Sequence, residues 1–237
     1  MIINNKYKNI KCKICDSSTT IFGVCDFNKN CVNTDKLKLI GYPIYYHICN
    51  NCNFIFTTDL DSWSIKEYKE YIYNDEYILV DPSYEYDRPH SLVSWFMPLL
   101  EQNFKKSDLI LDYGAGTSVF GNELSSLGWN CSSWDPVWEL PLIFNNKFDL
   151  ITAFEVLEHT PTPIKTTEEI LSLLSSNGKI LIQTLCNDSS LEEGINCWYI
   201  SPRNGHVSMH STKSLSIMFS KYNKKVKHLS LNTHIVY

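Results

Sequence analysis

Two glycines and a following acid have the types and spacing of a site for a nucleotide-like ligand. The stretch ILDYGAGTSVFG, residues 110–121, has the pattern of a buried strand that ends at an acid and breaks into a glycine-rich turn before a helix. Gly114 and Gly116 allow the backbone to approach a ligand closely and to take positive φ angles. Asp135 follows Gly116 by 135 − 116 = 19 residues. At that spacing a carboxylate ending the next strand accepts hydrogen bonds from ribose hydroxyls.

The same turn departs from the pattern that binds a dinucleotide. That fingerprint requires a third small residue at position 119, and the chain has Val119 there. A pyrophosphate resting on the N-terminus of the helix is therefore poorly supported. The spacing predicts an adenosine that carries a non-phosphate group. The alternative is a sheet whose glycine turn has only a structural role.

Four motifs in order resemble those of the class I S-adenosylmethionine-dependent methyltransferases. LDYGAGTSVFG is similar to their first motif, SSWDP to their second, and FDLITAFEVLEHTPTP to the strand and acidic loop that follow. LSLLSSNGKILIQT is similar to their next helix and fifth strand. The resemblance covers about residues 109–237. Ser118 stands where the family usually carries a third glycine, and we expect only a modest change in the turn.

The resemblance implies S-adenosylmethionine as the cofactor and gives roles to particular residues. The first acid and the two glycines would hold its methionine end, and Asp135 its ribose. Phe154 and Glu155 would line the sulfonium, while Arg88 would pair with the methionine carboxylate. The whole set expected around the cofactor is Asp112, Tyr113, Gly114, Ala115, Gly116, Asp135, Pro136, Phe154, Glu155 and Arg88.

Two CxxC pairs near the start of the chain, CKIC and CNNC, have the spacing of a zinc site. Their cysteines are Cys12, Cys15, Cys49 and Cys52, with 49 − 15 − 1 = 33 residues between the pairs. Four thiolates close a tetrahedral structural zinc site that leaves no position for substrate, and the metal stabilises a head with too little core of its own. Cys25 and Cys31 are rival ligands with a less typical spacing. Buried free thiols and a redox pair are the other interpretations.

A zinc head before a methyltransferase core is similar to one subgroup of the family, the enzymes that methylate sugars. These include nucleotide-linked sugars and the sugars of capsules and antibiotics. The resemblance implies O-methylation of a sugar or sugar-like hydroxyl, free or linked to phosphate or nucleotide, in polysaccharide or capsule biosynthesis. Oxygen is favoured because no set of residues suggests stabilisation of a carbanion.

Three histidines are candidates for the base that methyl transfer requires. The acceptor must lie in line with the methyl group and lose a proton, and histidine is the natural base near neutral pH. His159 lies in EVLEHTPTP, and His206 and His210 lie in SPRNGHVSMH. His206 is the first choice. The alternative for His159 is a loop histidine that orients Glu155 or Glu158.

Two segments could form the wall of the acceptor site. CWYISPRNGHVSMHS mixes aromatic surface with polar donors, as a saccharide pocket needs, and its candidates are Trp198, Tyr199, Arg203 and Asn204. Arg203 could hold a phosphate or carboxylate through a bidentate contact. The tyrosine-rich segment 70–90 could fold over the cofactor as a lid or pack between domains.

The elements that position these residues follow from the hydrophobic pattern. The fold class predicted is α/β, a Rossmann-like seven-stranded methyltransferase sheet with a small N-terminal zinc-ribbon-like domain. Prolines 82 and 89 predict a loop. Strands are predicted at 109–111, 129–134, 148–154, 179–184, 226–231 and 233–237, and helices up to Gly128, at 168–174 and at 213–219. The predicted domains are 1–60 for zinc, 61–106 as a helical and tyrosine-rich connection and lid, and 107–237 for the methyltransferase.

Composition restricts the partners. The chain has 237 residues, of which 43% are hydrophobic and 20% charged, as in soluble globular proteins. No apolar stretch approaches the roughly 20 residues that span a bilayer. Nine cysteines without the apolar core of a signal peptide predict a reducing cytoplasm. A formal net charge of −5 argues against a nucleic-acid binder with a basic surface.

The sequence therefore predicts a cytoplasmic methyltransferase that acts on a small, sugar-like molecule. One alternative is an RNA or protein methyltransferase whose zinc head docks the macromolecule. The other is a non-catalytic module that binds zinc and a nucleotide. A divalent metal at the acceptor site and the oligomeric state are left open.

Overall fold

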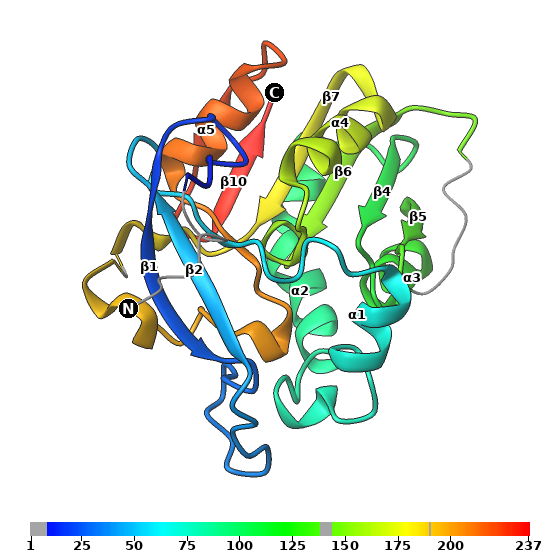
Figure 1. Ribbon diagram of the computed structural model, residues 1–237. Coiled ribbons are helices and arrows are strands. Elements are labelled where there is room, and N and C mark those ends of the chain that lie inside the picture. Colours follow the sequence, from blue (N-terminus) through cyan, green and yellow to red (C-terminus); the bar gives the residue numbers. More distant parts are fainter. Residues whose placement is uncertain (1–8, 138–143, 190) are drawn as a thin grey trace.

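Continuous apolar strands form a mixed sheet at the centre of the C-terminal part. In the computed structural model, which describes residues 9–137, 144–189 and 191–237, the strand order is β5-β4-β6-β7-β10-β9 (Figure 1). Neighbours among the first four strands run parallel, and the last two are antiparallel additions. The bounds are β4 Leu109–Tyr113, β5 Asn130–Trp134, β6 Phe148–Phe154, β7 Leu174–Gln183, β9 Val226–His228 and β10 Thr233–Val236.

Two helices cover one face of this sheet. They are α2 (Asp87–Asn103) and α3 (Val119–Ser126). Ile110, Leu150 and Leu181 pack in one hydrophobic cluster with the buried side chains of both helices. Since successive side chains of a strand point to opposite faces, these three positions define the side that α2 and α3 bury.

The other face lies under α4 (Pro163–Leu173) and α5 (Thr212–Ser220). Leu111, Ile151 and Ile180, each one residue away from a position on the first face, pack there with apolar side chains of both helices. The sheet is thus the middle of three layers, which explains why its strands are apolar on both sides.

The described residues contain six strands of this sheet, where the sequence predicts seven, and this is a correction. Between the end of β5 and the start of β6 lie 148 − 134 − 1 = 13 residues. A single crossover between parallel strands takes about a dozen residues, and the described part of this connection contains no strand. The six strands that are present lie within a few residues of the positions that the sequence predicts.

A second, four-stranded sheet contains the N-terminal strands β1 (Thr19–Asp26), β2 (Pro43–Cys49) and β3 (Ile55–Thr57) in the order β1-β2-β3-β8. Its fourth strand, β8 (Ser208–Met209), comes from the long connection after β7 and pairs with β3. Figure 1 shows this sheet beside the main one. The head is therefore completed by residues far along the chain, and a zinc-ribbon-like domain of its own stays a prediction.

The connecting segment, residues 61–106, which joins the N-terminal strands to the main sheet in the sequence, is largely helical. Ser64 and Glu67 form a reciprocal capping box at the start of α1 (Ile65–Tyr71). The loop predicted from the prolines exists at Pro82 but not at Pro89, which lies in the first turn of α2, where its missing N–H costs no hydrogen bond. Short 3-10 turns lie at Tyr77–Leu79, Leu157–His159, Asn187–Ser189, Leu191–Asn196 and Pro202–Asn204.

Helix boundaries also show how local signals act. Gly128, predicted to end a helix, takes a φ of 86° just after α3. The helix predicted at 168–174 begins earlier, because Pro163 occupies the first helical position that proline favours. In the part of the chain that the structure describes, no helix combines the length and apolar character needed to span a bilayer.

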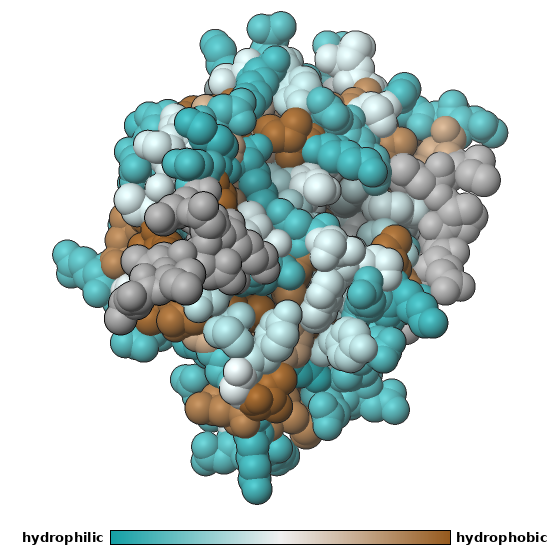
Figure 2. Space-filling model, in the orientation of Figure 1, coloured by the Kyte–Doolittle hydropathy of each residue, from teal (hydrophilic) through white to brown (hydrophobic). Residues whose placement is uncertain are grey.

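The connection between β1 and β2 exposes an apolar surface. Leu39, Ile40 and Tyr42 are all more than half exposed. In Figure 2 apolar colour gathers at the lower end of the molecule, where Figure 1 shows this connection. These residues lie apart from the cavity described below.

Neighbouring aromatic residues on α2 allow a test of this packing. Phe96 is fully buried, with its ring centroid 5.7 Å from those of both Phe120 and Phe154, whereas Trp95 is 47% exposed. Phe96→Ala should lower the free energy of unfolding by about 3–5 kcal/mol, and Trp95→Ala by less than about 1 kcal/mol. Urea denaturation of both variants measures the difference. Equal losses would contradict the packing of α2 on the sheet.

Candidate functional site

The glycine turn after β4 is held by hydrogen bonds from its backbone N–H groups to the end of β5 and to the side chain that follows it. Gly114 N–H donates to the Trp134 carbonyl at 2.8 Å, and Gly116 N–H donates to the Asp135 carboxylate at 2.9 Å. Gly114, Gly116 and Ser118 all have positive φ, at 76°, 51° and 61°. A left-handed serine costs about 1–2 kcal/mol relative to glycine, which explains why a glycine is expected at position 118.

A cavity of about 530 Å³ opens at the carboxyl ends of the parallel strands, beside this turn. Such crevices are where open α/β sheets bind ligands, and the volume is that of a small-molecule site. The structure brings all ten residues predicted around the cofactor to this one cavity. They are Asp112, Tyr113, Gly114, Ala115, Gly116, Asp135, Pro136, Phe154, Glu155 and Arg88.

Residues that the sequence did not single out complete the cavity. The connecting segment contributes aromatic side chains, among them Trp63, Tyr73, Tyr77 and Tyr84, as its prediction as a lid allowed. Another part of the wall, which the sequence did not predict, is the loop before α4 and the first turns of that helix. Its members are Thr160, Pro161, Thr162, Lys165, Thr166 and Glu169. The sequence signal for this part of the wall was the TPTP segment directly after the acidic motif. This segment leads into α4 at the edge of the sheet.

Asp112, at the end of β4, is a buried carboxyl group of the cavity. Burial raises its pKa to about 7, the nearby Asp135 adds to the rise, and the hydrogen bond from the Thr152 hydroxyl opposes it. A cationic group bound beside Asp112 would stabilise its charged form, because a buried charge is costly without a partner.

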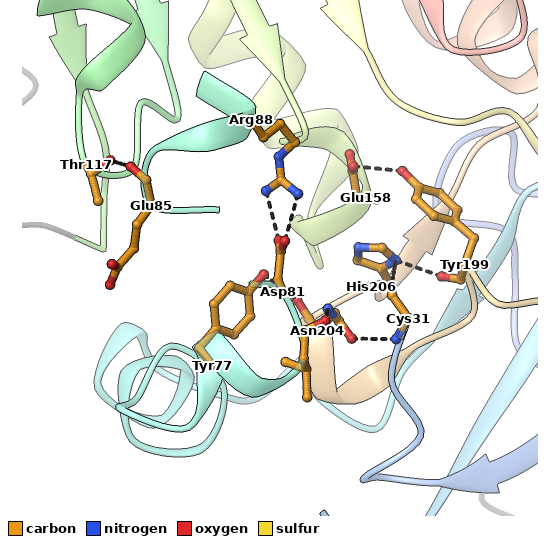
Figure 3. A network of polar contacts seen from close by, with 11 residues as sticks. Cys31, Tyr77, Asp81, Glu85, Arg88, Thr117, Glu158, Tyr199, Asn204 and His206 are labelled. Atoms are coloured by element: carbon orange, nitrogen blue, oxygen red, sulfur yellow. Dashed lines mark hydrogen bonds and ion pairs between the residues drawn. The ribbon is translucent and has the colours of Figure 1, made fainter. Parts of the chain in front are cut away.

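Two further carboxyls lie at the end of β6. Glu155 lines the cavity and has a φ of 54°, a strained backbone for a residue that is not glycine. Burial, followed by the charge of Glu158, raises the pKa of Glu155 well above its usual range. Glu158 is fully buried and accepts a hydrogen bond from the Tyr199 hydroxyl at 2.7 Å (Figure 3). It also accepts one from the Thr184 hydroxyl at 2.9 Å.

Of the three histidines predicted as bases, His159 lines the cavity, and His206 and His210 do not. His206 lies directly behind His159, with 4.9 Å between ring centroids, and its Nδ1 lies 2.7 Å from the Tyr199 carbonyl oxygen. His210 packs against Phe54 in the core. Burial lowers the pKa of His159 to about 4 and those of His206 and His210 to about 3, so all three are neutral at pH 7.

The four residues predicted to contact the substrate do not line the cavity. Trp198 is 49% exposed on the surface, and the hydroxyl of Tyr199 is taken up by Glu158. Arg203, predicted to hold a phosphate or carboxylate, is only 2% exposed and donates instead to the Ile72 carbonyl at 2.8 Å. The loop has the predicted aromatic and polar composition, but Tyr199, Arg203 and Asn204 face protein partners and Trp198 faces the surface.

Some of these partners belong to the tyrosine-rich connecting segment. Asn204 donates to the Val80 carbonyl and accepts from the backbone N–H of Cys31 (Figure 3). With Arg203 on Ile72, the loop after β7 therefore fixes the tyrosine-rich segment in place. The residues predicted as a substrate wall act on the cavity by positioning.

Arg88 also differs from its predicted role in one respect. It lines the cavity, but its guanidinium makes a bidentate pair with Asp81 at 3.0 and 2.8 Å (Figure 3). A methionine carboxylate would have to share this guanidinium with Asp81.

The four predicted zinc ligands come together at one point. Sulfur–sulfur distances are 3.7 Å for Cys12–Cys52, 3.4 Å for Cys15–Cys49 and 3.7 Å for Cys15–Cys52. A tetrahedral site with zinc–sulfur bonds of about 2.3 Å has sulfur–sulfur edges of about 3.8 Å, so the cluster has the size of a zinc site. The rival Cys25 and Cys31 lie outside it.

The first CxxC pair also contacts the cavity wall. Lys13, between its two cysteines, donates to the Pro161 carbonyl at 3.1 Å and to the Thr57 carbonyl at 2.8 Å. The same ammonium forms an ion pair with Asp61. Pro161 and Asp61 both line the cavity, so the geometry of the cysteine cluster is linked directly to that of the site.

Comparison with known proteins gives one family. The family described as "Methyltransferase domain" matches residues 84–229, more than half of the chain. No curated protein matches the chain.

Several solved structures are similar at low identity. The magnesium protoporphyrin IX methyltransferase of Synechocystis PCC 6803, solved with bound S-adenosyl-L-homocysteine, has 14% identity and a TM-score of 0.42, with 63% of this chain and 80% of that one covered. The glycopeptide N-methyltransferase MtfA has 8% identity and 0.42, covering 61% and 88%. The YcgJ protein of Bacillus subtilis has 17% and 0.43, covering 60% and 71%. These scores carry no argument about particular residues.

The buried histidines make stability depend on pH. His210 binds a proton near pH 3 when folded but near pH 6.5 when unfolded, so acid favours the unfolded chain as the pH falls below 6.5. Between pH 6.5 and 5 the free energy of unfolding should fall by about 1.5 kcal/mol more in the wild type than in His210→Gln. Urea denaturation at both pH values measures this. Parallel pH profiles would contradict a buried neutral imidazole.

Proposed function

The chain belongs to the family of methyltransferase domains, and on that premise we propose that it transfers the methyl group of S-adenosylmethionine to a small polar acceptor. The observation that carries the proposal is the single cavity of about 530 Å³ lined by all ten residues of the expected cofactor site. The ends of three parallel strands, β4, β5 and β6, and the first turn of α2 bring these residues together from four separate parts of the sequence.

The cofactor would be held by groups that the fold already orients. The Asp135 carboxylate accepts from the backbone N–H of Val137 at 2.7 Å and of Gly116 at 2.9 Å, which fixes it to receive ribose hydroxyls. The methionine ammonium would lie by Asp112, whose charged form it stabilises. Phe154 and Glu155 would lie against the sulfonium, as an apolar surface and a carboxyl that favours positive charge.

We propose a sugar or sugar-like hydroxyl as the acceptor. The wall from the connecting segment offers aromatic faces such as Trp63 and Tyr73, on which a saccharide ring packs, and the wall at the start of α4 offers Thr160 and Thr162 as polar partners. Lys165 on that wall would suit a phosphate-linked or nucleotide-linked sugar. Such a substrate belongs to polysaccharide or capsule biosynthesis.

The transfer itself places few demands on the protein beyond geometry and the fate of one proton. The acceptor oxygen must lie about 3 Å from the methyl group and in line with the breaking carbon–sulfur bond. Its proton must leave as the new carbon–oxygen bond forms. His159 and Glu155 line the cavity together at the end of β6, and we place the reacting end there.

We also propose structural zinc in the cluster of Cys12, Cys15, Cys49 and Cys52. The sulfur spacing fits the ion, and backbone N–H groups of Ile14 and Asn51 lie 3.4 Å from the sulfurs of Cys12 and Cys49, where they would stabilise thiolates. Thiols and no disulfides among the described residues support a reducing, cytoplasmic location.

Asp135→Asn tests the cofactor site. The variant keeps the shape of the side chain but loses the charge, and hydrogen bonds to charged groups contribute about 1.5–3 kcal/mol. Calorimetric titration with S-adenosylmethionine should therefore show affinity about 10-fold to 100-fold weaker than that of the wild type. The exposed Asp75→Asn is the matched control and should bind like the wild type.

The same titration separates the proposal from its rivals. A folded wild type that does not bind S-adenosylmethionine would refute the cofactor assignment. Binding without turnover on any sugar, RNA or protein acceptor would instead favour a non-catalytic module.

Zinc content tests the cysteine cluster. The four-cysteine cluster of the wild type should hold one zinc ion per chain, since one closed four-thiolate site takes one ion. Cys12→Ser should lose it and unfold at lower urea concentration, whereas Cys25→Ser, outside the cluster, should retain it. Elemental analysis after dialysis gives the metal content. Zinc that survives in Cys12→Ser and is lost in Cys25→Ser would assign the ion to the rival cysteines.

A further inference from the structure

A second group of metal-ligating side chains lies behind the cavity wall. Glu158, His159 and His206 each offer one ligand atom, and these atoms all lie within 4.8 Å of one another. Two of them come from the short turn after β6 and the third from the loop after β7. The group contains no cysteine and is separate from the four-cysteine cluster.

Hydrogen bonds to neighbouring residues already orient the His206 ring and the Glu158 carboxylate. His206 has its Nδ1 2.7 Å from the Tyr199 carbonyl oxygen, so Nδ1–H donates there and Nε2 keeps the lone pair. The hydroxyl of the same Tyr199 donates to Glu158 (Figure 3). The Thr184 hydroxyl donates to the other carboxylate oxygen of Glu158. In metal sites of proteins, hydrogen bonds of this kind, to a backbone carbonyl or from hydroxyls, orient the side chains that bind the metal.

Among the described residues, the negative charge of the Glu158 carboxylate and one ring nitrogen of His159 are left unsatisfied. Glu158 is fully buried, and the hydroxyls of Tyr199 and Thr184 donate to its carboxylate without neutralising its charge. The neighbouring carboxyl of Glu155, with a pKa raised by burial and by Glu158, supplies no positive charge, and the nearby guanidinium of Arg88 is paired with Asp81. The buried Nδ1 of His159 has no hydrogen-bond partner among the described residues. A cation would satisfy both the carboxylate and this nitrogen.

We propose that Glu158, His159 and His206 bind a divalent transition-metal ion of the zinc type. Two neutral imidazoles and one carboxylate are a ligand set of catalytic zinc sites, which keep a further coordination position open. The ion would fix the His159 ring in the cavity wall and place positive charge beside the reacting end. That consequence rests on the proposed function, whereas the binding of the ion does not.

A bound ion changes the role of His159. A ring nitrogen that coordinates a cation is no longer a free base, so the acceptor would be activated by the nearby positive charge. Without the ion, His159 returns to the role of a free imidazole base. The presence of the ion therefore decides between two modes of proton removal.

Cobalt titration of the full chain, with zinc already bound, tests the site. Co²⁺ should bind at one equivalent per chain with weak visible d–d bands and without the intense thiolate-to-cobalt absorption of a cysteine site. Glu158→Gln and His206→Gln, which keep the side-chain size closely, should weaken this binding at least tenfold. Tyr199→Phe, which removes only the hydroxyl on Glu158, should weaken it about 10-fold.

The control is His90→Gln, the same change at an exposed histidine outside the group, and it should bind cobalt like the wild type. Zinc content and circular dichroism verify that each variant is folded. The proposal is overturned if the folded wild type binds no such equivalent, if cobalt enters only with thiolate absorption, or if the variants bind as tightly as the control. None of these readings depends on S-adenosylmethionine, so failure here leaves the proposed function standing.

Discussion

The site depends on the parallel pairing of β4 with β6. The register places Ile110 opposite Leu150 and Asp112 opposite Thr152, so both strands end at the same edge of the sheet. The turn after β4 and the turn after β6 then approach so closely that a Cβ on Gly114 would lie 2.5 Å from a methyl carbon of Val156. Glycine is required there for space as well as for its positive φ. This contact brings the expected cofactor residues and the acidic loop to one cavity.

The remaining walls of the cavity are held by long-range contacts. Lys13 connects the first cysteine pair to Pro161, and β8 completes the N-terminal sheet. Arg203 and Asn204 fix the tyrosine-rich segment from the opposite direction. The cysteine head, the connecting segment and the loop after β7 thus form one structure around the cavity. Loss of the zinc ion that we propose for the cysteine cluster should therefore alter the cavity wall at Pro161, through Lys13.

Local patterns explain which features were predictable. The glycine turn, Asp135 and the apolar strands could be predicted from residue spacing and hydrophobic periodicity. The structure places them together. The loop after β7 was harder, because Tyr199 and Arg203 have the same composition whether they face a ligand or a protein partner. Only the position of Ile72 and Glu158 decides that they face inward. Pro89 was misinterpreted because proline is equally suited to a loop and to the first turn of a helix.

The most direct test of the account is a crystal structure of the protein grown with S-adenosylhomocysteine. The account predicts the ligand in the cavity beside Gly114 and Gly116, with its ribose hydroxyls hydrogen-bonded to Asp135 and its sulfur facing Phe154 and Glu155. Ligand density at any other place, or a ribose without contact to Asp135, would contradict the central claim that the carboxyl edge of β4, β5 and β6 is the methyl-transfer site.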